Sequence, residues 1–306
     1  MTAGGVYRIG ALSRRALLAV AMVHLSGLPA LGQSNNRRQR IVTFDWALTA
    51  TALTLGANVV GLPSIDYYRI TTVEPPVPAG VVDVGLLFTP NFEILDELAP
   101  DIIVIPSALN YTAGSLQRIA PTIVVDLYRG DPDPIRAAVS ATVQLAEKLD
   151  LKEAAAALVA RTDQTLAASK EATKGWQDKP FFVGTFADER HLTIFGAGSL
   201  YDAVLKRLSL RNAAEGKSML NGRAVVGIEE LSRRPDAAIL LFPQGGNNAV
   251  PANSAAGIFW QSLPAVRDER VFWLSPTLED GGLPATIRFA RLVAAALPKD
   301  PDHASL

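Results

Sequence analysis

Short apolar runs alternate with segments of helical periodicity along the first half of the chain. Continuous runs such as Ile102-Ile103-Val104-Ile105 are typical of buried strands, and helices are predicted between them. We expect strands at 41–44, 59–62, 102–105 and 122–125, and helices at 46–55, 90–98, 116–119 and 135–149. This alternation predicts a mostly parallel sheet covered by helices on both faces.

Two local signals refine this reading of the first half. Asn91 is placed to cap the helix over 90–98, and Pro134 is typical of the first turn of the helix that follows it. The segment over 64–80 is rich in proline, so we expect an irregular loop there.

The second half repeats the same style. Its predicted strands lie at 181–186, 192–195, 237–242 and 271–274, and its predicted helices at 200–208, 228–233 and 285–297. The segment over 245–256 has no periodicity and is expected to be a loop.

The longest helical segment lies between these halves, over 150–175. Asp150 followed by Glu153 has the pattern of an N-cap with its capping-box partner, and Lys174 and Gly175 are typical of a helix end. A stripe at near-helical spacing is expected to be buried: Leu151, Leu158, Val159, Thr162 and Leu166. We therefore predict a helical strut between two α/β lobes, over 40–149 and 176–300, with the working site in the cleft between the lobes.

Residues 1–32 have the pattern of an export signal. Arg8, Arg14 and Arg15 precede an apolar run of 13 residues over 16–28, too short for a membrane span of about 20 residues. The sequence Ser13-Arg14-Arg15-Ala16-Leu17-Leu18 also resembles a twin-arginine signal. The alternative is a buried N-terminal helix. With the leader removed, the net charge changes from −1 to about −4. We expect an exported protein of the periplasm.

Composition narrows the classes of function. The chain of 306 residues is 49% hydrophobic and 19% charged, as in a globular protein. A net charge of −1 without a basic patch argues against nucleic acid as a partner. The absence of cysteine excludes disulfides, thiolate metal sites and a cysteine nucleophile.

Little in the sequence indicates catalysis. His191 is the one histidine outside the leader and the tail, so a Ser-His-Asp triad would have to use it; the alternative is a surface or hydrogen-bonded role in a loop. No metal-ligand spacing of His or Cys is present. We therefore expect no catalytic residues, no metal site and no cofactor, and any transition metal would arrive already chelated.

Several segments carry a pattern shared with a known family. VEPPVPAGVVDVG, over 73–85, is followed by Pro90-Asn91-Phe92-Glu93-Ile94-Leu95, and two later segments lie over 118–121 and 190–196. Together they resemble the periplasmic ferric-hydroxamate siderophore-binding proteins of ABC importers, over about residues 40–297. The resemblance implies an α/β fold of two Rossmann-like lobes joined by one long rigid helix, which is the class III periplasmic binding protein.

The resemblance also gives a role to two acidic residues. Glu93 and Glu229 lie near predicted helix starts, one in each lobe, where an acid commonly complements the helix dipole. In this family and in the similar cobalamin binders, one carboxylate on each lobe docks arginines of the membrane permease. Those carboxylates match Glu93 and Glu229, which makes an inner-membrane ABC permease the expected partner.

The family's ligand contacts carry over less directly. Where the hydroxamate binders have an arginine, a tyrosine and tryptophans, this sequence has Leu87, Leu109, Asn221 and Leu278. Tyr111 could take the place of the tyrosine after a shift of two residues, and Trp46 stands where the family often has an aromatic residue. The leucines favour a more apolar ligand than ferrichrome. Glu279 and Asp280 would suit a cationic or amine-bearing ligand, or they lie in a solvated loop.

The leading hypothesis is a monomeric, exported receptor that binds an iron(III)–siderophore complex for an ABC importer. A second hypothesis replaces the cargo with haem, cobalamin or another metal chelate. The competing class is a periplasmic enzyme that acts on the chelate, which would need His191 beside a nucleophile or a redox cofactor in the cleft.

Overall fold

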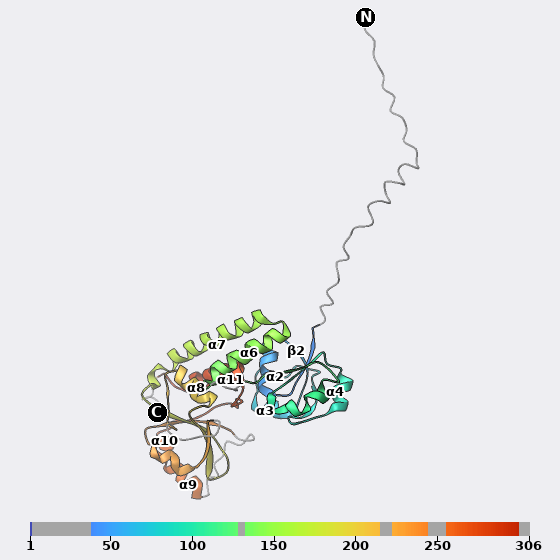
Figure 1. The fold of residues 1–306 in the computed structure, drawn as a ribbon. Coiled ribbons are helices and arrows are strands. Elements are labelled where there is room, and N and C mark those ends of the chain that lie inside the picture. Colours follow the sequence, from blue (N-terminus) through green and yellow to red (C-terminus); the bar gives the residue numbers. More distant parts are fainter. Residues whose placement is uncertain (2–37, 128–131, 215–221, 244–254, 300–306) are drawn as a thin grey trace. The chain divides into compact units, whose positions relative to one another are not determined.

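The computed structural model describes residue 1 and residues 38–127, 132–214, 222–243 and 255–299. Residues 39–306 form one compact unit, whose elements can be followed by colour in Figure 1. Apart from Met1, the predicted leader lies outside the described residues and stays a prediction. No helix within the described ranges is both long and apolar enough to span a bilayer.

The first sheet has five parallel strands in the order β3-β2-β1-β6-β7. Their central members are short runs of Ile and Val, and every residue of β6 is buried, as expected of a parallel sheet covered on both faces. This confirms the alternation predicted for the first half, although the helix predicted over 116–119 lies earlier in the chain and ends at Leu116. The strands are β1 (Arg40–Thr43), β2 (Asn58–Leu62), β3 (Val82–Asp83), β6 (Ile102–Ile105) and β7 (Thr122–Val124).

Two helices that connect strands of this sheet begin with side-chain caps. Asn91 accepts hydrogen bonds from the N–H groups of Glu93 and Ile94, as predicted. Asp133 caps the helix that begins at Pro134, where the proline was predicted to lie in the first turn. A small antiparallel hairpin, β4 (Gly85–Leu86) with β5 (Thr89–Pro90), follows β3. The helices are α2 (Trp46–Thr54), α3 (Ile65–Thr71), α4 (Phe92–Leu98), η1 (Ser107–Thr112), α5 (Ala113–Leu116) and α6 (Pro134–Leu149).

Helix α3 corrects the prediction of an irregular loop over 64–80. The carboxylate of Asp83 accepts hydrogen bonds from the N–H groups of Ser64 and Ile65, at 3.2 and 2.9 Å, and so caps the helix from a distant part of the chain. The prolines begin only after the helix has ended. Tyr68 anchors α3, because its ring is buried and its hydroxyl donates to the carbonyl of Pro75.

The long helix α7 (Lys152–Ala172) has 21 residues. Its N-terminal signal was misassigned: Asp150 has a φ of 56° and forms the left-handed C-cap of α6, while Leu151 is the N-cap of α7. The two helices therefore follow one another through a tight turn, and they lie side by side in Figure 1. Leu158, Thr162 and Leu166 are buried as predicted, whereas Leu151 and Val159 of the predicted stripe are only partly buried.

The second sheet is mixed, in the order β11-β9-β8-β12-β13, with β10 also paired to β8. β8, β12 and β13 are parallel, whereas β9 is antiparallel to β8 and to β11. The prediction of a mostly parallel sheet fails at β9 because a short turn joins it to β8, and such a turn allows only antiparallel pairing. The strands are β8 (Pro180–Phe186), β9 (His191–Phe195), β10 (Arg211–Asn212), β11 (Arg223–Gly227), β12 (Ala238–Phe242) and β13 (Val271–Trp273).

The predicted helices of the second half agree with the structure within a few residues, except that 228–233 is a 3-10 helix; the helices α9 and α10 were not predicted. Most of the loop predicted over 245–256 lies outside the described residues. The helical elements are η2 (Lys174–Trp176), α8 (Leu200–Arg207), η3 (Ile228–Arg233), α9 (Ala255–Ser262), α10 (Pro264–Arg267) and α11 (Gly282–Ala296).

The hydrophobic core joins both sheets. Each sheet has one face with its own apolar cluster, around Ile103 in the first and Ile239 in the second. The opposite faces contribute to one shared cluster, which includes Val104, Val183 and Phe289. Helix α11 belongs to the second segment by sequence, yet it packs against α2, α6 and α7. Because one core is shared by both sheets, the core does not mark where one lobe ends. The predicted domain boundaries, 40–149, 150–175 and 176–300, therefore stay a prediction.

Candidate ligand-binding site

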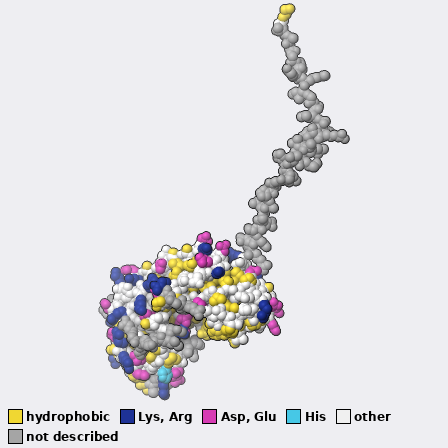
Figure 2. Space-filling view, viewed as in Figure 1, with side chains coloured by type: hydrophobic (Ala, Val, Ile, Leu, Met, Phe, Trp, Pro, Cys, Tyr) yellow, Lys and Arg dark blue, Asp and Glu magenta, His cyan; other side chains and the backbone are white. Residues whose placement is uncertain are grey.

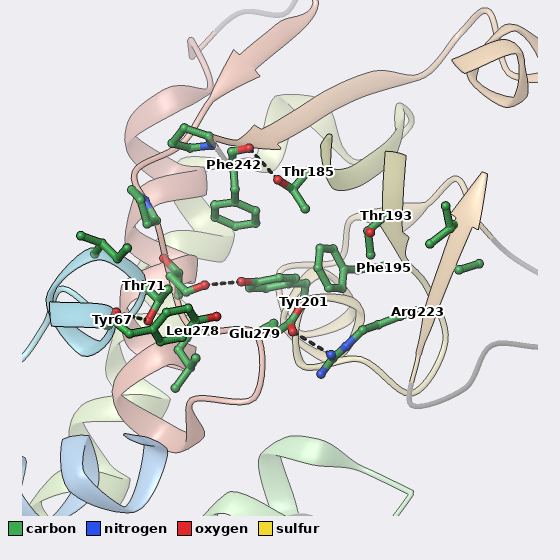
Figure 3. A pocket seen from close by; sticks show the side chains of 16 residues that line it. Tyr67, Thr71, Thr185, Thr193, Phe195, Tyr201, Arg223, Phe242, Leu278 and Glu279 are labelled. Carbon is green, nitrogen blue, oxygen red and sulfur yellow. Dashed lines mark hydrogen bonds and ion pairs between the residues drawn. The ribbon is translucent and has the colours of Figure 1, made fainter. Parts of the chain in front are cut away.

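A cavity of about 750 Å³ lies between helix α3 and the second sheet (Figure 3). This volume is within the range typical of small-molecule sites. Its walls come from α3, from β8, β9, β11 and β12, from α8 and from the loop before α11. The lining residues are Tyr67, Ile70, Thr71, Thr185, Thr193, Phe195, Tyr201, Arg223, Ala224, Val225, Phe242, Pro243, Pro276, Thr277, Leu278 and Glu279.

Tyr201 is the centre of an aromatic group on the second-sheet side of the cavity. Its ring meets Phe195 edge-on at 4.8 Å between centroids and stacks on Phe242 at 4.9 Å. Its hydroxyl donates a 2.6 Å hydrogen bond to the carbonyl of Thr277. All three rings are buried, so this wall is rigid and largely apolar.

The opposite wall is one face of α3. Tyr67 and Ile70 are 47% and 59% exposed there, so their side chains are available for contact with a ligand. The Tyr67 ring packs on Trp46 with a centroid distance of 4.4 Å, and the Trp46 indole N–H donates to the carbonyl of Pro63. Trp46 thereby supports Tyr67 from behind.

Two charged side chains, Arg223 and Glu279, occur among the described lining residues. Arg223 Nη1 lies 2.7 Å from Glu279 Oε1, and the same guanidinium contacts the carboxylate of Asp280 (Figure 3 shows the Arg223–Glu279 pair). Burial raises the pKa of Glu279 above its usual value; Arg223 opposes the rise and Asp280 adds to it.

The N-cap of α2 belongs to the same electrostatic environment. Burial raises the pKa of Asp45, hydrogen bonds from the N–H groups of Leu48 and Ala47 oppose the rise, and the charges of Asp280 and Asp126 add to it. Several carboxylates therefore influence one another near the loop before α11.

Arg288 holds that loop in place. Its Nε donates a 2.9 Å hydrogen bond to the carbonyl of Pro276, and its Nη1 pairs with Glu74 in the loop after α3. The Arg288 side chain is 7% exposed. The loops at the two sides of the cavity are thus joined through one buried guanidinium.

The structure brings only part of the predicted ligand set to this cavity. Leu278 and Glu279 line it, as predicted for ligand contacts. Trp46 contacts the lining residue Tyr67 without lining the cavity itself. Whether any of these residues touches a ligand stays a prediction.

The other predicted contacts lie elsewhere. Leu109 is fully buried in the cluster of the first sheet. Leu87 lies in the turn of the β4–β5 hairpin, and Tyr111, which is 70% exposed, donates from its hydroxyl to the carbonyl of Phe88 in that turn. None of the three lines the cavity. Asn221 lies outside the described residues.

Sequence analysis missed most of the lining residues. Tyr67 lay in the segment expected to be a loop, and Tyr201 lay in the helix predicted over 200–208 with no role assigned to it. Arg223 precedes the β-branched pair Val225-Val226, which was the available signal for strand β11.

The two predicted docking residues are both exposed. Glu93 is in the first turn of α4 and Glu229 in the first turn of η3. Neither forms an ion pair within the described part of the chain. Both carboxylates are therefore accessible.

His191 does not itself line the cavity, although Thr193 of the same strand does. It begins β9, its side chain is 48% exposed, and its Nδ1 lies 2.9 Å from both carboxylate oxygens of Asp188. Across the described residues, no group of three or more His, Asp or Glu side chains could hold a metal ion.

Acidic and basic side chains are intermixed over the face shown in Figure 2, in agreement with the small net charge. Exposed apolar residues occur at the hairpin β4–β5 and beside it, where Leu86, Phe88 and Phe92 are 65%, 58% and 40% exposed.

Residues 41–278 match the periplasmic binding protein family. Among individual proteins, the iron(3+)-hydroxamate-binding protein FhuD of Escherichia coli (strain K12) is 28% identical over 292 residues, which cover 94% of this chain and 97% of that protein.

Solved structures show the same fold. The siderophore-binding protein FhuD from Vibrio cholerae, bound to Fe3+–Desferal, superposes with a TM-score of 0.78 and 24% identity, over 86% of this chain and 100% of that chain. The petrobactin-binding protein YclQ from Bacillus subtilis has a TM-score of 0.67 and 20% identity, over 84% and 91% of the two chains. The predicted fold class, two α/β lobes joined by one long helix, is confirmed.

Proposed function

Because this chain belongs to the periplasmic binding protein family, we propose that it is the substrate-binding protein of an ABC importer for iron(III)–siderophore complexes, of hydroxamate or related type. Two observations support this cargo. The Escherichia coli relative, similar over almost its whole length, is named for binding ferric hydroxamates. The cavity has the volume and the aromatic lining that a compact, largely apolar chelate requires.

The aromatic cavity is the observation that carries the proposal. A ferric siderophore presents a rounded surface of methylene groups around an iron atom whose ligand positions are filled by its chelator. Tyr67 on one wall and Tyr201, Phe195 and Phe242 on the other can contact such a surface. The hydroxyl of Thr193 can donate to its carbonyl oxygens, whereas the hydroxyls of Thr71 and Thr185 already donate to the backbone carbonyls of Tyr67 and Phe242. Iron is thus held through its chelator, without protein-to-iron bonds.

The ligand would be released chemically unchanged. The His191 ring is hydrogen-bonded to Asp188 at the surface and does not line the cavity, which argues against a catalytic role for it. We therefore propose a carrier that performs no covalent chemistry.

Delivery requires a location and a docking partner. The leader over 1–32 would export the chain to the periplasm, where a monomer would meet the permease in the inner membrane. The exposed Glu93 and Glu229 would pair with permease arginines. Exposed ion pairs are worth only about 0.2–1 kcal/mol each, which suits docking that must be reversible.

A titration with a chelate panel tests this function. Purified protein without its leader is mixed with ferric hydroxamate, catecholate and carboxylate siderophores, and with haemin and cobalamin, while tryptophan emission is recorded. Trp46 contacts the lining residue Tyr67, so binding should quench it. We expect ferric hydroxamates to bind with a Kd of about 1 μM or tighter. Quenching by haemin or cobalamin alone would assign the cargo to that class instead.

A further inference from the structure

Beside the cavity, two carboxylates, those of Glu279 and Asp280, share one guanidinium, that of Arg223. Arg223, Glu279 and Asp280 have side-chain exposures of 32%, 35% and 52%, so all three are partly enclosed. One guanidinium faces two carboxylates, and within the described residues no second Lys or Arg pairs with either acid. The group carries one excess negative charge.

A further acid lies in the same surroundings: the charge of Asp280 acts on the buried carboxyl group of Asp45, whose pKa is raised mainly by burial. Arg223 is the single cation among the described lining residues. An anionic ligand that approached Arg223 would therefore be repelled by two nearby carboxylates. A cationic ligand would be attracted by the carboxylate charge that Arg223 does not neutralise.

We propose that the cargo bears a cationic group, such as a primary ammonium, beside its iron chelate, and that Glu279 and Asp280 receive it. This inference rests on the proposed function and specifies its substrate class. The ammonium would take a position beside Glu279 Oε2, since Arg223 approaches Oε1. The half-exposed ring of Tyr67 also lines the cavity, and its open face would attract a cation.

The test compares two ferric complexes that differ by one charge. Desferal is an acyclic trihydroxamate with a free terminal amine, and acetylation of this amine removes the charge and leaves the iron centre unchanged. We expect the wild-type protein to bind the cationic complex about five- to tenfold more tightly at low ionic strength, as one partly enclosed ion pair allows. The ratio should fall toward one in 1 M salt, because exposed charges are then screened.

Variants locate the effect. Glu279→Gln and Asp280→Asn should each lower the ratio of the two affinities, and the double variant should bring it close to one. Glu171→Gln, an exposed acid on α7, is the matched control and should keep the wild-type ratio. The salt dependence of the wild-type protein gives a readout that does not depend on any variant.

Each outcome decides one of the two proposals. Equal binding of both complexes, or tighter binding of the acetylated one, would overturn the inference and leave the proposed function standing. A wild-type preference that Glu279→Gln and Asp280→Asn leave intact would also overturn it. If neither complex binds, and no other ferric siderophore binds, both the proposed function and the inference are overturned.

Discussion

The aromatic residues that line the cavity differ in how much they also support the fold. Tyr201 is 1% exposed and fixed by the carbonyl of Thr277, yet it contributes to the cavity wall. Tyr67 has the opposite character, since half of its side chain is open and its ring rests on Trp46. A residue of the second kind can be altered with little effect on folding.

Tyr67→Ala should therefore weaken binding of a ferric hydroxamate about tenfold, because an aromatic contact of about 1.4 kcal/mol is removed. Tyr67→Phe should retain most of the affinity, since the ring remains. Titration by calorimetry measures both. Phe259→Ala, at an exposed aromatic residue outside the cavity, is the matched control. An unchanged affinity in Tyr67→Ala would show that cargo does not contact α3.

At the scale of the element, the first turn of α2 is stabilised by one capping side chain, Asp45. Asp45 Oδ1 accepts a 2.8 Å hydrogen bond from the N–H of Leu48 and caps α2. Burial nonetheless raises its pKa, so the folded state disfavours the ionised form. The stabilisation linked to this shift is present below the unfolded-state pKa and is lost as pH rises through the folded-state pKa.

Two substitutions separate the cap from the charge. Asp45→Asn keeps an acceptor without a charge, so its stability relative to wild type should improve as pH rises from 3 to 7. Asp45→Ala removes the acceptor and should be about 1 kcal/mol less stable than Asp45→Asn at every pH. Urea unfolding across this pH range measures both differences. Parallel pH profiles for Asp45→Asn and wild type would contradict the assignment of the shift to Asp45.

At the scale of the whole molecule, the shared cluster and α11 connect the two sheets. Val104 and Val183 belong to one core, and Arg288 joins the loops on either side of the cavity. Such a body is expected to change shape little when cargo binds. Recognition by a permease would then depend on surface positions such as Glu93 and Glu229.

The double variant Glu93→Ala, Glu229→Ala should abolish transport and leave ligand affinity within about twofold, because exposed positions outside the cavity contribute little to binding. Uptake of iron-loaded siderophore is measured in cells that depend on this protein, and affinity is measured on the purified variant. Asp96→Ala, another exposed acid of α4, serves as control. Weakened ligand binding in the double variant would argue against a role limited to docking.

The sequence by itself determined the alternation of strands and helices, the long helix α7 and the two-lobed fold class, because periodicity and buried apolar runs act over a few residues. One error arose where a distant residue acted, because Asp83 caps α3 from outside the helix. Another arose at the short turn between β8 and β9, which makes the two strands antiparallel. Only the tertiary structure decided the cavity: it placed Leu109 in the core and brought Tyr67, Tyr201, Arg223 and Glu279, from separate elements, around one space. Their proximity depends on how helices pack on sheets, which no local pattern encodes.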